Sequence, residues 1–176
     1  MNAELVARDF KPELISRRGE WIAWLGCMIV GAAWLILAVF DQGVNLLISI
    51  VFILLFLVAA SISLGNWMDR KTRLNLGPDG VAYHNGLRSV SLNWAEIQEV
   101  RVLPAPWGRK VQVLGEKVYF GFSTLGEVKA NDRIIGRTGF ADGEMILQRI
   151  IANAHLKNIQ PAEVGLPENS YYYARK

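Results

Sequence analysis

The chain has 176 residues, of which 52% are hydrophobic and 20% are charged, and its formal net charge is +3. This length allows one ordinary domain together with a smaller element. The single cysteine, Cys27, excludes a disulfide framework within the chain.

Residues 1–20 are predicted to form a cytoplasmic segment ahead of two long apolar runs. These runs cover about 21–40 and 44–67, and neither contains Asp, Glu, Lys, Arg or His. A transmembrane helix needs roughly 20 apolar residues, so each run predicts a membrane span. The first run is longer and starts later than the core of a signal peptide, so we expect it to remain as an anchor. Without ionisable residues in the spans, transport by this chain alone is not expected.

The connection Asp41–Gly43 is so short that the runs predict an antiparallel hairpin over 21–68. Cations flank both outer ends of this hairpin and are missing from the connection, which places both termini in the cytoplasm. Tryptophans gather at the same ends, as an interfacial aromatic belt would. The residues predicted to meet the membrane interface or lipid are Arg17, Arg18, Trp21, Trp24, Trp67, Arg70, Lys71 and Arg73.

Small residues in both runs allow close approach between helices. Gly26 and Gly31 lie in the first run, and residues 59–65 of the second run are also rich in small side chains. Such residues seat one span against the other or dock a helix of another protein. Both glycines are therefore candidate partner contacts.

After Arg73 the hydrophobic period changes to two, with turn signals at Gly77–Gly80 and Asn85–Gly86. Further strands are predicted at 97–103, 110–114, 118–122 and 133–138. Apolar residues at helical spacing predict a helix over 142–156, with Asp142 as its N-cap. The predicted fold class is α+β: a transmembrane hairpin, then an antiparallel β-barrel or sandwich over 70–157 that a C-terminal helix caps. We expect an extended tail over 158–176.

The stretch from Leu74 to Ile97, L-x-L-G-P-D-G-V-x-Y-x-N-G-x-R-x-V-S-L-x-W-x-E-I, resembles the bacterial pleckstrin-homology-like (bPH) membrane proteins. The predicted helix is similar to the closing helix of that family. The resemblance implies a PH-like fold at the bacterial inner membrane that binds or assembles other proteins. The family is also similar to factors that assemble photosynthetic and other membrane complexes. The loop Gly77–Gly80 has an acid and no cation, unlike the inositol-phosphate sites of the wider PH superfamily.

No catalytic, metal or cofactor site is predicted. His84 and His155 have no cysteine or carboxylate at ligand spacing. Gly136–Gly139 lacks the full dinucleotide fingerprint and favours a turn. We therefore expect a protein that is not an enzyme, needs no cofactor, and binds neither nucleic acid nor a small-molecule substrate.

Two binding functions remain. The first is an accessory, scaffold or assembly subunit of a larger membrane complex, photosynthetic or respiratory among the alternatives, which contacts other integral membrane proteins. The second is a sensor that binds anionic lipids of the cytoplasmic leaflet through cations of the β region. Trp107 lies in a proline-rich loop and either anchors a partner or plugs the mouth of the barrel. The further candidate partner contacts are Trp107, Arg109, Lys110, Tyr171, Tyr172 and Tyr173.

Overall fold

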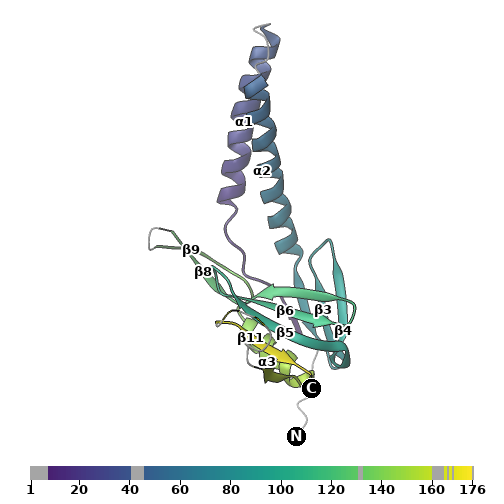
Figure 1. Ribbon diagram of the computed structural model, residues 1–176. Coiled ribbons are helices and arrows are strands. Elements are labelled where there is room, and N and C mark those ends of the chain that lie inside the picture. The colour runs from purple at the N-terminus through teal and green to yellow at the C-terminus, as the bar shows by residue number, and fades with distance from the viewer. Residues whose placement is uncertain are drawn as a thin grey trace. The chain divides into compact units, whose positions relative to one another are not determined.

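The structure is a computed structural model that describes residues 8–40, 46–130, 133–159, 165, 167 and 169–175. It contains two compact units: a helical unit, Ser16–Met68, and a β unit formed by the chain up to Ile15 and from Asp69 onward (Figure 1). The helical unit is thus an insertion in the β unit, which is assembled from two separate parts of the chain. The connection Asp41–Gly43 lies outside the described residues.

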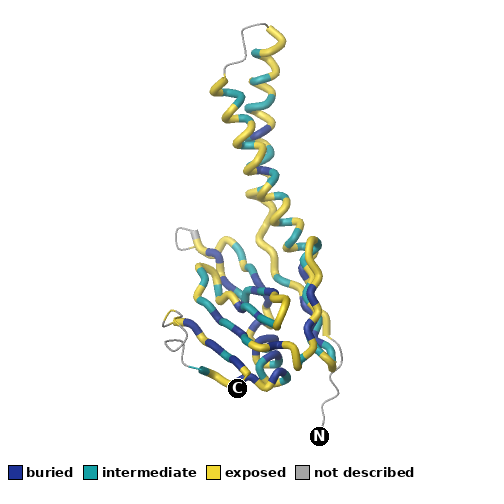
Figure 2. Tube along the Cα trace, turned by 45° about the vertical axis from the view of Figure 1, so that its right-hand side comes forward, coloured by how far each residue is buried: buried dark blue, intermediate teal, exposed yellow. Residues whose placement is uncertain are grey.

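The helical unit consists of α1, Arg18–Val39, and α2, Leu46–Lys71, whose last residues belong to the β unit. Both helices are long and apolar enough to cross a membrane. Only 6% of the most apolar 18-residue window of each helix is buried, whereas the core helix of a water-soluble protein is mostly buried. Figure 2 shows this exposure along both helices. Apolar side chains therefore form most of their outer surface.

The first sheet of the β unit is antiparallel, with strand order β1-β2-β3-β4. Its strands are β1, Arg8–Phe10; β2, Arg73–Leu76; β3, Gly80–His84; and β4, Ser89–Asn93. Alternate residues such as Leu74, Leu76 and Val81 are buried, which confirms the predicted period of two. The predicted Asn85–Gly86 turn is also confirmed, since Gly86 has a φ of 84° and the Asn85 side chain accepts the N–H of Arg88 at 2.8 Å.

The second sheet has strand order β10-β11-β5-β6-β7, with antiparallel pairing throughout. A short 3₁₀ helix, Trp94–Glu96, leads into β5. The strands are β5, Ile97–Pro104; β6, Arg109–Gly115; β7, Tyr119–Ser123; β10, Lys157–Ile159; and β11, Tyr171–Ala174. A separate hairpin joins β8, Gly126–Ala130, to β9, Arg133–Thr138. None of the described sheets closes on itself, so the described strands do not form the closed barrel that was one predicted alternative.

The core of the β unit lies between the two larger sheets and helix α3, Gly143–Asn153. This helix contributes Ile146, Leu147 and Ile150, which are almost fully buried and recur at helical spacing. Burial of each such side chain contributes roughly 2 kcal/mol relative to exposure. The predicted C-terminal helix is confirmed, with shorter bounds than 142–156.

Both terminal strands of the β unit differ from the sequence prediction. Strand β1 pairs with β2 and places Phe10, 4% exposed, opposite Leu74. Strand β11 pairs with β5, so part of the expected tail 158–176 is a strand inside the sheet. Arg175 holds its end: its side chain donates to the carbonyls of Trp94, Ala95 and Ala154 at 2.9, 2.9 and 3.2 Å. Strands this short have too few residues to show a clear period. Their stability comes from pairing with strands that are distant in sequence, which the local sequence does not reveal.

Candidate interaction surfaces

Polar contacts join α1 and α2 near the start of α1. Both carboxylate oxygens of Glu20 accept hydrogen bonds from α2: one from the Ser63 hydroxyl at 3.0 Å and one from the Asn66 amide at 2.9 Å. The indole N–H of Trp24 also donates to Ser63, at 2.8 Å. Interhelical hydrogen bonds of this kind stabilise membrane helix pairs by about 0.6–2 kcal/mol each. The polar groups of this region are therefore partnered within the hairpin.

Close packing continues along the line of contact between α1 and α2, which we call the seam. A Cβ atom on Gly31 would lie 2.8 Å from Cε2 of Phe52, so the glycine makes room for that ring. Trp34 stacks on Phe52 with ring centroids 6.4 Å apart, and its N–H donates to Ser49 at 2.9 Å. Apart from its chain neighbours and the backbone of its own helix, no described atom lies within 4 Å of a Cβ built on Gly26. The structure therefore separates the two candidate glycines: Gly31 seats α2 against α1, while Gly26 does not.

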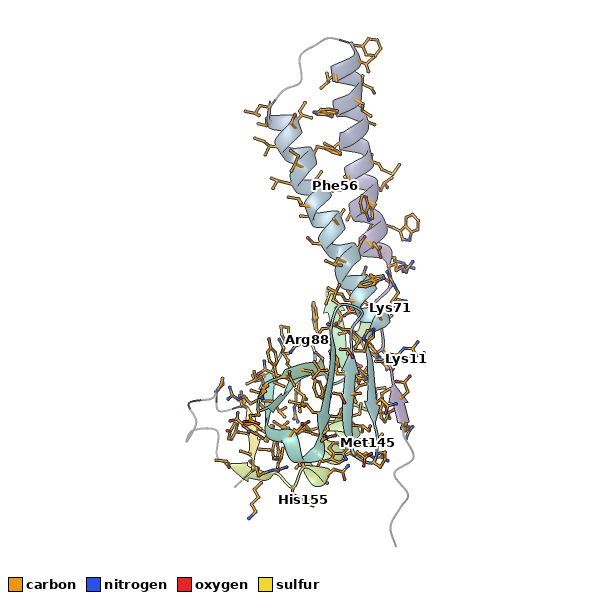
Figure 3. The ribbon with its side chains drawn as sticks, turned by 90° about the vertical axis from the view of Figure 1, so that its right-hand side faces the viewer. Lys11, Phe56, Lys71, Arg88, Met145 and His155 are labelled. Carbon is orange, nitrogen blue, oxygen red and sulfur yellow. The ribbon has the colours of Figure 1, made fainter. Side chains whose placement is uncertain are left out.

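An apolar groove of about 470 Å³ opens beside the seam. Phe56, labelled in Figure 3, meets Trp24 edge-on at a centroid distance of 5.8 Å. Met28 and Leu35 are exposed by 68% and 56% within this groove. The lining residues are Trp24, Cys27, Met28, Gly31, Ala32, Trp34, Leu35, Phe52 and Phe56. The groove can accept apolar side chains or an acyl chain.

The predicted interface residues have different environments. Trp21 is 72% exposed and Trp67 is 38% exposed, as residues that meet an interface would be. Arg73 lies 3.6 Å from the Asp9 carboxylate across β1 and β2, an exposed pair worth at most about 1 kcal/mol. The other cations lie at the outer ends of the two helices: Arg17 and Arg18 at α1, Arg70 and Lys71 at α2.

The candidate partner contacts of the β unit are only partly brought together. The Arg109 guanidinium lies 5.2 Å from the Tyr171 ring centroid and 3.6 Å from the Glu144 carboxylate, and so links β6, β11 and α3. Trp107, two residues away, is 47% exposed in the β5–β6 loop, and Lys110 is exposed on β6. Since Trp107 is half-exposed, it does not serve as a buried plug.

The three tyrosines of β11 do not form one surface. Tyr171 is 42% exposed, whereas Tyr172 is buried against Arg101 and Tyr173 packs on the core. Burial raises the pKa of the Tyr172 and Tyr173 hydroxyls. Only Tyr171 of this group remains available to a partner.

A small cleft of about 150 Å³ lies where the chain leaves the β unit toward the helices. Leu14 from the N-terminal side and Asp69 from the C-terminal side both line it, together with Tyr83. The pKa of the Tyr83 hydroxyl is raised overall, because the effect of burial exceeds the lowering effect of the side-chain hydrogen bonds with Thr72 and Asn85. The cleft is smaller than the roughly 300–1,000 Å³ of typical ligand sites. It shows instead that the two chain segments leading to α1 and α2 lie on the same face of the β unit.

Three exposed aliphatic side chains of the β unit were missed by the sequence reasoning. Leu87, in the β3–β4 turn, is 63% exposed, and Ile134 and Ile135, on β9, are 55% and 57% exposed. Arg88 and Arg133 are their immediate neighbours in sequence. The available signal was an aliphatic residue beside arginine at a turn or hairpin, a pattern too short to separate from an ordinary strand end.

Comparisons with protein-family models, with curated proteins and with solved structures each found no match to this chain. Among the described residues, no group of three or more His, Cys, Asp or Glu side chains could hold a metal ion.

The two glycines of α1 provide a matched test of the seam. We expect Gly31→Leu to destabilise the hairpin by about 1–3 kcal/mol relative to Gly26→Leu, because only position 31 faces the Phe52 ring. Helix propensity cancels in this comparison, since both variants replace glycine with leucine in one helix. Denaturation of the full chain in mixed micelles, followed by tryptophan fluorescence, gives the difference. Equal stability of the two variants would contradict the packing described.

Alkaline pH provides a test of the Tyr83 environment. Its folded-state pKa is raised above the ordinary value of 10.0, so the folded state holds this proton more tightly than the unfolded state. The associated stability is complete below pH 10 and is lost as pH rises through the folded-state pKa. We expect Tyr83→Phe to reduce the fall in unfolding free energy above pH 10 and to leave its slope unchanged at neutral pH. An unchanged alkaline slope would show that Tyr83 titrates as it does in water.

Proposed function

We propose that this chain is a membrane-anchored binding subunit without enzymatic activity. In this proposal the hairpin spans the bacterial inner membrane twice, and the β unit is a PH-like domain in the cytoplasm. The subunit serves as an accessory, scaffold or assembly component for other integral membrane proteins.

The charge distribution supports the proposed sidedness. Arg17 and Arg18 precede the apolar part of α1, and Arg70 and Lys71 end α2, while the connection between the helices has no cation. Excess Lys and Arg in short flanking segments favours the cytoplasmic side. Both outer ends of the hairpin, and the β unit with them, are therefore assigned to the cytoplasm.

The arrangement of the β unit supports a PH-like fold. Two antiparallel sheets enclose one core, and helix α3 follows the β8–β9 hairpin and covers that core. A fold of this type does not by itself define an activity. The partner must be inferred from surfaces instead.

The groove on the helical unit is the observation that carries the proposed partner. A bilayer supplies no hydrophobic gain for helix association, so association depends on close packing and on room for side chains. The groove has aromatic walls at Trp24, Phe52 and Phe56, and the missing side chain of Gly31 lets the Phe52 ring pack against α1. Its occupant in this proposal is a transmembrane helix of another protein, packed against Met28.

Site-specific photo-crosslinking in cells tests this assignment. A photoreactive residue at position 28 should give one discrete, heavier protein adduct, because Met28 is exposed inside the groove. The matched control is position 54: Leu54 is 56% exposed on α2, on a helix face away from Phe52 and Phe56 by the helical period. This control should yield only the free chain. Absence of an adduct at position 28, or the same adducts at both positions, would contradict the proposed helix contact.

A further inference from the structure

The two chain segments that connect the β unit to α1 and α2 define one face of the β unit. Residues 12–14 and residues 69 and 72 line the same cleft, so both connections leave from one place. Helix α1 begins at Arg18, three residues after Ile15, and α2 ends at Lys71. Three residues span at most about 10 Å, so a membrane that holds α1 and α2 lies within a short chain length of this face.

The β3–β4 turn belongs to this face. Strand β2 starts two residues after α2 ends and pairs Arg73 with His84, which places the following turn beside the connection. Leu87 at the turn is 63% exposed. The Arg88 guanidinium lies 4.7 Å from the ring centroid of Tyr119, which is itself 58% exposed. Figure 3 shows Arg88 and Lys71 at the same end of the β unit, and Met145 of α3 toward the other end.

The β8–β9 hairpin reaches the same face from the other connection. The N–H of Glu13 donates to the carbonyl of Gly139 at 2.7 Å, and a Cβ on Gly136 would lie 3.7 Å from Ile15. The chain that leads into α1 therefore runs along β9. A bulge between Val128 and Lys129 leaves Ile135 without an opposite residue in the ladder.

Strand β9 presents apolar and cationic side chains together. Ile134 and Ile135 are more than half exposed, and Arg133 and Arg137 on the same strand are also exposed. Glu127 of β8 lies 3.6 Å from Lys129, so this acid is engaged within the hairpin. Exposed aliphatic groups beside arginines suit the boundary between lipid headgroups and acyl chains, where both parts find favourable surroundings.

We propose that the β3–β4 turn and the β8–β9 hairpin form a second, peripheral membrane contact that binds an anionic lipid surface. Leu87, Ile134 and Ile135 enter the headgroup region, and Arg88, Arg133 and Arg137 contact lipid phosphates. The inference rests on the proposed membrane anchorage and adds the orientation of the β unit to it. Lipid is favoured over a protein here because the bilayer already lies within a few residues of this face and carries the complementary charge.

Single-cysteine labelling of the full chain in nanodiscs tests this contact. Cys27→Ala removes the only native cysteine, and an environment-sensitive fluorophore is then attached at Leu87→Cys, Ile134→Cys or Ile135→Cys. The matched surface control is Gln148→Cys, exposed on α3. We expect blue-shifted emission at positions 87, 134 and 135 and quenching by nitroxide-labelled lipids, with neither at position 148. The shift should weaken in zwitterionic nanodiscs and at high salt.

A label within the span separates failure of this inference from failure of the anchor. Ile29→Cys lies on α1, 62% exposed, and should be quenched by lipid nitroxides whatever the β unit does. If position 29 is quenched but 87 and 134 behave like 148, the peripheral contact is wrong and the anchor stands. If position 29 is not quenched, the anchor itself is wrong. Labels at 87 and 134 that are shielded from water but not quenched by lipid would show that protein covers this face, and would also overturn the inference.

Discussion

The outward-facing side chains of α1 and α2 impose the constraint on which the other features depend. Ile, Leu, Val, Met and Phe cover these helices, and most of them are exposed within the described chain. Burying one such side chain is worth roughly 1.5–3 kcal/mol, so this surface is unfavourable in water over its whole length. Polar groups near the start of α1 lie toward the other helix: the Ser63 hydroxyl and the Asn66 amide both donate to the Glu20 carboxylate. The exposed Ser61 hydroxyl donates to the Leu57 carbonyl of its own helix, so these polar groups are hydrogen-bonded within the hairpin, as a bilayer requires.

The insertion of this hairpin between β1 and β2 determines how the β unit is attached. Strand β1 precedes the helices and pairs with β2, which follows them, so the chain before the helices and the chain after them meet in one backbone ladder. The segment after β1 continues along β9 through the contact between Glu13 and Gly139. The β unit is therefore joined to the helical unit by two segments of chain rather than by a single linker.

The helical unit and the β unit carry different exposed apolar surfaces. The groove at Met28 lies on the helical unit and suits a partner within the bilayer. Leu87, Ile134 and Ile135 lie on hairpins of the β unit and suit the boundary between lipid and water. Each surface combines residue types that are unfavourable in water with a position near the proposed membrane.

Much of the fold could be predicted because its signals are local. The apolar runs, the alternation around Val81 and Val90, the Asn85–Gly86 turn and the spacing of Leu147 and Ile150 each lie within one element. The terminal strands could not be predicted, since Phe10 and Tyr172 are buried only by pairing with β2 and β5. The expected domain 70–157 is therefore shorter than the β unit, which begins before the hairpin and includes residues of the tail.

The candidate site was harder to predict, because exposure is set by tertiary packing. The tyrosines at 171, 172 and 173 are alike in sequence, yet pairing with β5 buries Tyr172 and leaves Tyr171 accessible. Gly26 and Gly31 are equivalent by composition, and only the position of Phe52 distinguishes them. Extraction of native membranes with alkaline carbonate, followed by flotation on a density gradient, tests the central requirement that lipid covers α1 and α2. We expect the chain to float with the lipid fraction, and its recovery in the soluble fraction would show that lipid does not cover these helices.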